Sequence, residues 1–581
     1  MVKIDGAAIL AKALKAEGIE VIFSLTGGHI YRVYQEVDKL GIKVVDCRHE
    51  GAAAYAATGY AMASGKPGVV LLTAGPGVTN AVTQVCDCML GDVPVLFLGG
   101  ASATEHDLTE VLQEYDCVTL MKNNTLWSFE VQDTARIAEA VAVAFRNMEG
   151  AKTGPVYLEI PMDVLEGNKI DEKTVVYPEN YRSKYRVFGD PAAIEKAADL
   201  LIKAERPCIS IGNGAQFNCQ NPSSFKELAE YLQIPIDVSV TNTGRFFDDT
   251  GFPLAWVGSG AKGSCDVLLL FNDKPNHAAV QSMADGAKLI NVHRNHQNIG
   301  LNMPLDVGII GYADAVAEQL LACIKAKAPK VEKRPWIDDL FAGSAGALAH
   351  FESLFTSDAV PIHPARCASA IMDFLNSDRG KEYCYVVDGG DSVTWGLIAA
   401  SIKGVRHPFV GRGFMYSAIG CVGSSWGVLR GLYEAQKRPI IHSIGDGSFG
   451  QYTAELFTIA KDKIPYVCVI FNDANWGMIK AFSMYEVPEE NHDLGAFIGN
   501  PNDEGGVFRY EKIAKAWGGK GICVEKPEDL DGALHEAVEA SRGGVPAIVN
   551  VKLACKKEFF SMSTVRLYQE LGAGPKIKYK P

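Results

Sequence analysis

The chain has 581 residues, of which 48% are hydrophobic and 22% are charged, a balance typical of a globular protein. It is too long for one hydrophobic core, and usual domain sizes predict about three or four domains. The formal net charge of −13 argues against nucleic acid as a main partner, because a polyanion would be repelled. The longest apolar runs fall well short of the roughly 20 residues needed to cross a bilayer, so no membrane partner is expected. With no signal-peptide pattern and with scattered cysteines, we expect a cytoplasmic protein.

Residues 1–180 alternate between helix-like and strand-like segments. The pattern predicts helices near residues 5–17, 29–39 and 51–63, with apolar strands between and after them. Buried strands that alternate with helices indicate a parallel sheet covered on both faces. The polar stretch at residues 166–191 then breaks the pattern and is expected to be a linker.

Two further series of helices and strands follow, at residues 190–330 and 360–555. A second polar, proline-bearing stretch, "APKVEKRPWID", is expected to link them. We therefore predict an α/β protein of three consecutive, doubly wound parallel-sheet domains, followed by a basic tail at residues 556–581. The similar length of the first and third blocks suggests a structural relationship, although no strong sequence repeat supports it.

Two turns in the third block each place an acid directly after an apolar strand. "GDGSF" carries Asp446 between Gly445 and Gly447, and "FNDANWG" carries Asp473 close to Asn475. Two acids at the carboxyl ends of neighbouring strands repel each other unless a positive group lies between them. Mg²⁺ prefers oxygen ligands and commonly shares its shell with phosphates. The structural alternative is that one acid caps a helix and the other lies in an ordinary turn.

The pattern "GDGSF…ND", ending in "NWG", resembles the diphosphate-and-Mg²⁺ motif of thiamin-diphosphate-dependent enzymes of the acetolactate synthase and pyruvate decarboxylase-like family. The resemblance implies that Mg²⁺ is held by the side chains of Asp446 and Asp473 and by the main-chain oxygen of Asn475. The motif usually ends in two asparagines, and here Asn472–Asp473 places an acid at a ligand position. The residues that the resemblance assigns to the diphosphate are Gly445, Gly447, Ser448, Asn475, Gly477 and Met478.

A second resemblance lies far away in the chain. "RHEGAAAYAATGYA" is similar to the family's segment with its key glutamate, which assigns that role to Glu50. In the family this carboxyl hydrogen-bonds the aminopyrimidine ring and promotes the imino form that activates the cofactor. The structural alternative is an acid favoured in the first turn of a helix. The neighbouring His49 is interpreted as structural.

Other segments agree with the family in the same order along the chain. "TAGPGVTNAVTQV" resembles the Gly-Pro-Gly turn of the pyrimidine-binding domain and assigns Pro76 to the cofactor site. "VVDGGDS" resembles a cofactor-facing turn with Gly389 and Gly390 near the diphosphate. "YSAIGCVGSS" resembles the segment under the bend of the cofactor, with Ile419 as the apolar wedge and the Ser417 carbonyl at the pyrimidine amino group. In this family the active site forms between two subunits, so a homodimer or homotetramer is implied.

The cofactor itself generates the enamine, an acyl-anion equivalent, so the protein selects what enters and leaves. "SLTGGHIYRVYQ" and "TEVLQEYDCV" look most like benzaldehyde lyase and related acyloin lyases and carboligases. The resemblance implies that His29 and Gln113 face the reacting carbon of a small carbonyl substrate, such as a 2-hydroxy ketone of the acyloin or benzoin type. A histidine fits proton relay because its ordinary pKa lies near the working pH.

Several alternatives stay open at this point. Within the family they are 2-hydroxyacyl-CoA lyase, which takes a CoA thioester, acetolactate synthase-like enzyme, 2-keto-acid decarboxylase and cyclic-diketone hydrolase. Outside enzymes, a non-catalytic regulatory or scaffold homologue is the alternative. Acetolactate synthases usually carry Pro-Gly in the early loop, where this chain has Gly27–Gly28–His29. The central segment "FNDKPNH" lacks the turn of FAD-bearing relatives, so we do not expect a bound flavin. The basic tail, with Lys556 and Lys557, is either a solvated terminus or a cover for the site.

Overall fold

The computed structural model describes residues 3–183, 185–217, 219–238, 258–272, 283–301, 303–403, 409–412, 422–486, 492–499 and 506–560. These residues belong to two compact units. The first unit comprises Met1–Lys184, Gly413–Lys437 and Tyr452–Asp462, and the second comprises Tyr185–Arg412, Arg438–Gln451 and Lys463–Pro581.

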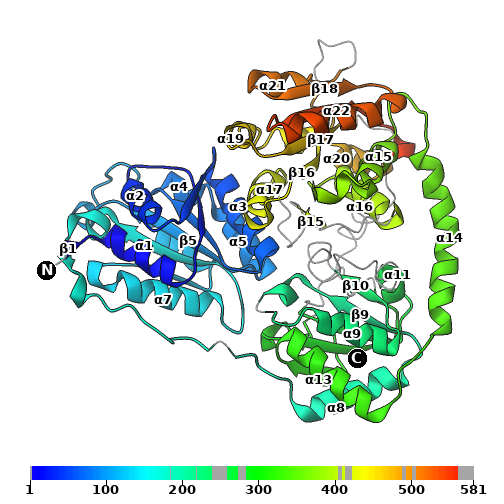
Figure 1. Ribbon diagram of the computed structural model, residues 1–581, viewed down its shortest axis with the longest axis horizontal. Coiled ribbons are helices and arrows are strands. Elements are labelled where there is room, and N and C mark those ends of the chain that lie inside the picture. The colour runs from blue at the N-terminus through cyan, green and yellow to red at the C-terminus, as the bar shows by residue number, and fades with distance from the viewer. Residues whose placement is uncertain are drawn as a thin grey trace. The chain divides into compact units, whose positions relative to one another are not determined.

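The first unit is built around a six-stranded parallel sheet. Its strands, in spatial order, are β3 (Lys43–Asp46), β2 (Val21–Ser24), β4 (Gly68–Leu72), β5 (Val95–Ala101), β7 (Val156–Pro161) and β6 (Trp127–Glu130). Helices α1 (Gly6–Ala16) and α7 (Ile137–Met148) cover one face, and α3 (Glu50–Ser64) and α5 (Val82–Gly91) cover the other (Figure 1). The predicted helices, and a sheet covered on both faces, are confirmed.

Helix α17 (Ser425–Gln436), from the C-terminal half of the chain, packs on α3 within the first unit (Figure 1). The two helix backbones touch, because a Cβ placed at Gly431 would lie only 1.9 Å from the carbonyl oxygen of Ala56. At the same surface Lys43 pairs with the buried carboxylate of Glu434 across 2.8 Å. Glycine is therefore required at position 431 because the two helices approach closely there, and not because of a turn.

The second unit contains two parallel sheets. The central sheet has the order β10 (Ile236–Val238), β9 (Pro207–Ile211), β11 (Val267–Phe271), β12 (Lys288–His293) and β13 (Val307–Ile310). The third sheet has the order β15 (Phe409–Arg412), β14 (Cys384–Val387), β16 (Ile440–Gly445), β17 (Tyr466–Asn472), β19 (Ala547–Lys552) and β18 (Lys520–Val524). Helices α8 (Pro191–Lys203), α9 (Ser223–Leu232) and α13 (Ala313–Lys327) accompany the central sheet, and α15 (Pro364–Asn376), α16 (Asp391–Lys403) and α22 (Leu530–Arg542) accompany the third.

The two six-stranded sheets share one topology. In each, the strands numbered along the chain from the first strand of the sheet lie in the order second, first, third, fourth, sixth, fifth. The suggested structural relationship between the first and third blocks is therefore confirmed, although the sequences show no repeat. Shared topology with different sequences is expected where burial, rather than particular side chains, decides the strand order.

The second expected linker is in part a helix. Helix α14 (Pro335–Phe355) begins at its proline and runs for 21 residues (Figure 1). Trp336 and Ile337, at its start, pack into the core of the central sheet, whereas Phe355, at its end, packs into the core of the third. Proline suits the first turn of a helix, so a proline-bearing polar stretch was a misleading sign of a loop.

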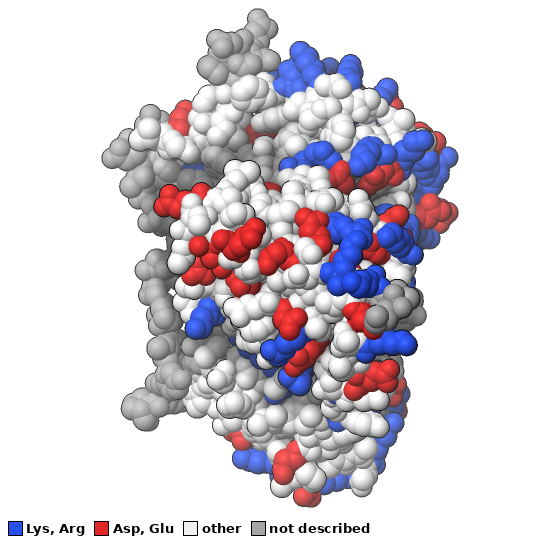
Figure 2. Space-filling model, turned by 90° about the vertical axis from the view of Figure 1, so that its left-hand side faces the viewer, with Lys and Arg blue, Asp and Glu red and all other residues white. Residues whose placement is uncertain are grey.

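On the face that Figure 2 shows, Lys and Arg side chains are interleaved with Asp and Glu side chains. In the part of the chain that the structure describes, no helix has the length and apolar character required to span a membrane.

Candidate active site

The described residues of the predicted site follow the carboxyl ends of strands, and His29, Gly389 and Gly390 follow β2 and β14, the strands at which the strand order reverses. In the first sheet β2 lies between β3 and β4, and in the third sheet β14 lies between β15 and β16. In open parallel sheets such a reversal opens a crevice at the carboxyl ends of the strands, and ligands bind there. The topology therefore supports both clusters as binding sites, one in each unit.

Glu50 is the first residue of α3 and follows β3. Its side chain is only 8% exposed, and its Oε2 accepts a 3.0 Å hydrogen bond from Nδ2 of Asn80. His49 caps the helix, since its Nδ1 accepts from the main-chain N–H of Gly51 at 2.9 Å. The structural interpretation of His49 is thus confirmed, and Glu50 is buried at a helix start as expected.

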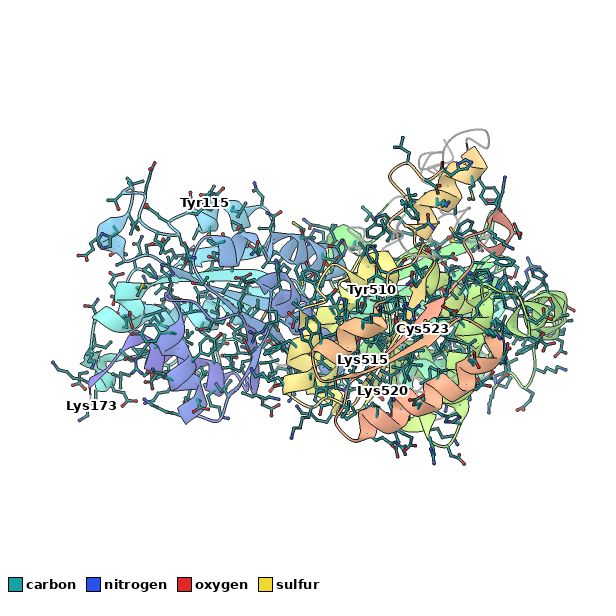
Figure 3. The ribbon with its side chains drawn as sticks, turned by 90° about the horizontal axis from the view of Figure 1, so that it is seen from above. Tyr115, Lys173, Tyr510, Lys515, Lys520 and Cys523 are labelled. Carbon is teal, nitrogen blue, oxygen red and sulfur yellow. The ribbon has the colours of Figure 1, made fainter. Side chains whose placement is uncertain are left out.

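Pro76 and Gln113 lie on neighbouring loops of the same unit. Pro76 begins the short helix α4 (Pro76–Thr79), whose end leads to Asn80, the partner of Glu50. A Cβ at Gly75, just before it, would lie 2.6 Å from the carbonyl oxygen of Gln113. The structure therefore brings the turns of Glu50, Pro76 and Gln113 together. Tyr115, labelled in Figure 3, is exposed on the Gln113 loop.

His29 follows β2 and lines a cavity of about 400 Å³ that lies entirely within the first unit. Its Nδ1 is 3.2 Å from the hydroxyl of Thr73, and burial lowers the pKa of the ring below its ordinary value. Gln113 is partly buried and is not among the residues that line this cavity, although Val111 and Leu112 are. His29 therefore presents a neutral imidazole to the cavity at neutral pH.

In the second unit, Asp446 follows β16 and Asp473 follows β17. Burial raises the pKa of Asp446 well above its ordinary value, and the nearby charge of Asp473 adds to the rise. Burial likewise raises the pKa of Asp473 to about 7, and the charge of Asp391 adds to it. The charge of one buried acid disfavours ionisation of the other. A cation bound by both carboxylates would stabilise their charged forms.

Asn475 shapes the turn around Asp473. Its main-chain N–H donates to Oδ1 of Asp473 at 3.0 Å, and its own Oδ1 accepts from Nζ of Lys480 at 3.0 Å. Lys480 thus binds the side-chain oxygen of Asn475, and the predicted metal role concerns its main-chain oxygen. Gly477, which with Met478 begins α20 (Gly477–Glu486), lies so close that a Cβ there would be 2.7 Å from Oδ2 of Asp473.

The two acidic turns are packed together. Gly447 and Ser448 lie in the single turn α18 (Asp446–Phe449), and a Cβ at Gly447 would lie 2.7 Å from the ring of Trp476. The main-chain N–H of Gly447 donates to Oδ1 of Asp446 at 3.0 Å. Gly445, which ends β16, has open space where a Cβ would be.

Gly389 and Gly390 follow β14 and precede α16, at the reversal point of the third sheet. Gly390 has a φ of +84°, a conformation that a side chain would strain. The next residue, Asp391, begins α16 and accepts a 2.9 Å hydrogen bond from Nε1 of Trp395. Its carboxylate thus orients a tryptophan and adds negative charge near Asp473.

Ser417 and Ile419 lie outside the described residues, so their roles stay predictions. The structure adds partners that the sequence did not single out: Asn80 beside Glu50 and Thr73 beside His29. The thiol of Cys555 hydrogen-bonds the Asp473 carboxylate. Tyr510, labelled in Figure 3 at the start of α21 (Glu511–Ala516), stacks edge-on against Phe449 with ring centroids 5.1 Å apart. Asn80 and Thr73 both lie within the "TAGPGVTN" turn, so that turn was the sequence signal from which these two partners could have been predicted.

Parallel sheets with polar turns at their reversal points define the molecule as an α/β protein of the cofactor-binding class. Family models for the N-terminal TPP-binding domain, the central domain and the C-terminal TPP-binding domain of thiamine pyrophosphate enzymes match residues 4–120, 194–320 and 388–551. The chain belongs to this family of thiamine pyrophosphate (thiamin diphosphate) enzymes. It is therefore an enzyme, and the scaffold alternative is set aside.

Curated relatives cover nearly the whole chain. A probable acetolactate synthase large subunit of Methanocaldococcus jannaschii is 29% identical over 551 residues, which is 92% of this chain and 90% of the relative. The human 2-hydroxyacyl-CoA lyase 2 is 26% identical over 594 residues, covering 94% and 91%. An acetolactate synthase large subunit of Mycobacterium tuberculosis is 27% identical over 553 residues, covering 94% of each. The relatives thus include two different activities.

Proposed function

We propose that this enzyme is a thiamin-diphosphate- and Mg²⁺-dependent C–C lyase or carboligase that acts on 2-hydroxy ketones. The observation that carries the proposal is the position of His29, a neutral imidazole on the wall of a cavity of about 400 Å³. A cavity of this size suits a small organic ligand. The loop that carries His29 also lacks the Pro-Gly of acetolactate synthases.

The donor set fits the metal and the diphosphate. Asp446, Asp473 and the main-chain oxygen of Asn475 offer only hard oxygen donors, as Mg²⁺ requires. Burial raises the pKa values of both acids, and a divalent cation bound by the two carboxylates would favour their charged forms. Gly447 and Gly477 allow the two acidic turns to pack closely, against Trp476 and Asp473.

In this proposal Glu50 would hold the aminopyrimidine ring, and the hydrogen bond from Asn80 orients its carboxyl. Thiamin diphosphate, when bound, would supply a carbon nucleophile for the substrate carbonyl. His29 accepts the proton of the substrate hydroxyl and later returns it. An imidazole that is neutral at the working pH of the enzyme is a suitable proton acceptor. Gln113 holds a water or the substrate from the adjoining loop. We propose a homodimer or homotetramer in which the two halves of each site come from different subunits, without bound FAD and in the cytoplasm.

The proposal is tested by reconstitution with thiamin diphosphate and Mg²⁺, followed by a screen of acetoin, benzoin, pyruvate and a 2-hydroxyacyl-CoA for products. Aldehyde release from acetoin or benzoin is expected. Carbon dioxide released from pyruvate with no cleavage of either hydroxy ketone would overturn it in favour of a decarboxylase or synthase.

A second candidate is 2-hydroxyacyl-CoA lyase, favoured by the human relative of that name. In the same screen, aldehyde released only from the thioester would assign that activity. The two candidates share the cleaved bond, a C–C bond between a hydroxyl-bearing carbon and a carbonyl carbon. They differ in whether the chain must also bind a nucleotide-bearing thioester.

A further inference from the structure

The cavity beside His29 contains a buried hydroxyl that has no hydrogen-bond partner among the described residues. Ser102 directly follows β5 and lines the cavity, and its side chain is only 8% exposed. Its Oγ has no hydrogen-bond partner among the described residues. Leaving a buried hydroxyl unpaired costs free energy, so native proteins usually pair such groups with protein, water or ligand.

The charged groups on the cavity wall are acidic. Asp163 is held in place by Thr104, whose N–H and Oγ1 donate to its two oxygens at 3.1 and 2.7 Å. Glu166 hydrogen-bonds the hydroxyl of Tyr31. Among the described residues that line the cavity there is no Lys or Arg, and its other titratable groups are imidazoles, His29 and His106. A carboxylate or phosphate of a ligand would thus meet like charge, and no Lys or Arg among the described lining residues offsets it.

The remaining wall is apolar. Val111, Leu112 and Met162 contribute hydrocarbon surface between the polar groups. A ligand that fills this space must therefore combine an apolar frame with a few hydroxyl or carbonyl groups, the usual composition of a small-molecule pocket.

We propose that this cavity holds the substrate side chain and selects uncharged, hydroxyl-bearing carbonyl compounds, with Ser102 as the specificity-determining hydrogen-bonding residue. The assignment rests on the proposed function only in that His29 is taken to adjoin the reacting carbon. The Ser102 hydroxyl pairs with the hydroxyl of the ligand, and Asp163 and Glu166 exclude anions.

The test uses the full chain without cofactor and measures binding by saturation-transfer NMR. The probes are acetoin, butanone, which has the same four-carbon frame without the hydroxyl, and pyruvate, which is anionic. Acetoin is expected to bind roughly fivefold more tightly than butanone, the worth of about one neutral hydrogen bond. In Ser102→Ala the affinities for acetoin and butanone are expected to become equal. Ser128→Ala, which removes a hydroxyl from β6 in the same unit, is expected to leave the ratio of the two affinities unchanged.

Two further variants keep the test decisive. Ser102→Cys keeps the shape of the side chain and offers only a weak donor, so it is expected to lower the ratio if the alanine variant does not fold. Glu166→Gln is expected to tighten pyruvate binding relative to acetoin. Equal binding of acetoin and butanone to the unaltered protein, or a ratio that survives Ser102→Ala, would overturn the proposal.

The outcome is separable from that of the proposed function, because binding needs no cofactor. If the pocket prefers acetoin but the reconstituted protein cleaves no hydroxy ketone, the role of Ser102 is supported and the proposed function is rejected. If the protein cleaves acetoin but the pocket does not distinguish acetoin from butanone, the proposed function is supported and the role of Ser102 is rejected.

Discussion

Asn80 donates a 3.0 Å hydrogen bond from Nδ2 to Oε2 of Glu50, joining the end of α4 to the first residue of α3. One oxygen of the buried carboxyl is therefore held in place by the turn that also carries Pro76. A carboxyl that must meet an aminopyrimidine ring in one geometry benefits from such support.

Glu50→Gln is expected to reduce kcat by at least about 100-fold, because an amide cannot exchange the proton that activates the cofactor. Binding of thiamin diphosphate is expected to survive, since the diphosphate and metal contacts are elsewhere. Steady-state kinetics and calorimetry measure the two effects separately. The matched control is Glu20→Gln, which alters an exposed acid that pairs with Lys66; unchanged kcat in the Glu50 variant would contradict the assignment.

Asn80→Ala is expected to lower kcat by roughly fivefold, the worth of about one hydrogen bond, with little change in KM for the substrate. Asn80 acts through Glu50 and is a positioning residue, so its effect should vanish in a Glu50→Gln background. A double-mutant cycle measures this coupling. Additive losses in the double variant would mean that Asn80 acts by another route.

Gly477→Ala is expected to weaken Mg²⁺ binding by about 10- to 100-fold, because the new Cβ would displace the Asp473 carboxylate. Titration with Mg²⁺ in the presence of thiamin diphosphate gives the change in affinity. Gly532→Ala, at a helical position with open space around it, is the control and should leave Mg²⁺ affinity unaltered. Equal affinity in the two variants would count against Asp473 as a ligand.

His442, on β16 within the core, is expected to make stability depend on pH. Burial lowers its pKa to about 3, so the folded state keeps the ring neutral while the unfolded chain binds a proton below about pH 6.5. The contribution is thus present above pH 6.5 and is lost as pH falls towards 3. Between pH 7 and pH 5 the unaltered protein should lose about 2 kcal/mol more unfolding free energy than His442→Gln.

Denaturant unfolding at the two pH values measures this difference. His350→Gln, which removes an exposed histidine, should track the unaltered protein at both. If His442→Gln also tracked it, the buried ring would not be the source of the pH dependence.

The sequence predicted those parts of the site that lie next to one another in the chain. Asp446 and Asp473 follow strands β16 and β17 as expected, and Glu50 begins α3, because strand ends and helix starts leave local signals. Three parallel sheets were also predictable from alternating apolar strands and helices.

What the sequence did not predict depends on contacts between distant segments. The pairing of Glu50 with Asn80 and the packing of α17 on α3 join residues that no local pattern connects. Helix α14 was missed because its polar, proline-bearing start resembles a loop, while the residues that stabilise it pack on two separate cores. The Ser102 hydroxyl is notable only for its burial, which a sequence does not show.

We propose that Asp446 and Asp473 hold a metal that in turn holds the cofactor diphosphate. Calorimetry of thiamin diphosphate binding, with Mg²⁺ and then with excess chelator, tests it most directly, alongside Asp446→Asn. We expect tight binding only with Mg²⁺, and loss of that binding in the variant. Equal affinity with and without the metal, or in the unaltered protein and the variant, would contradict it.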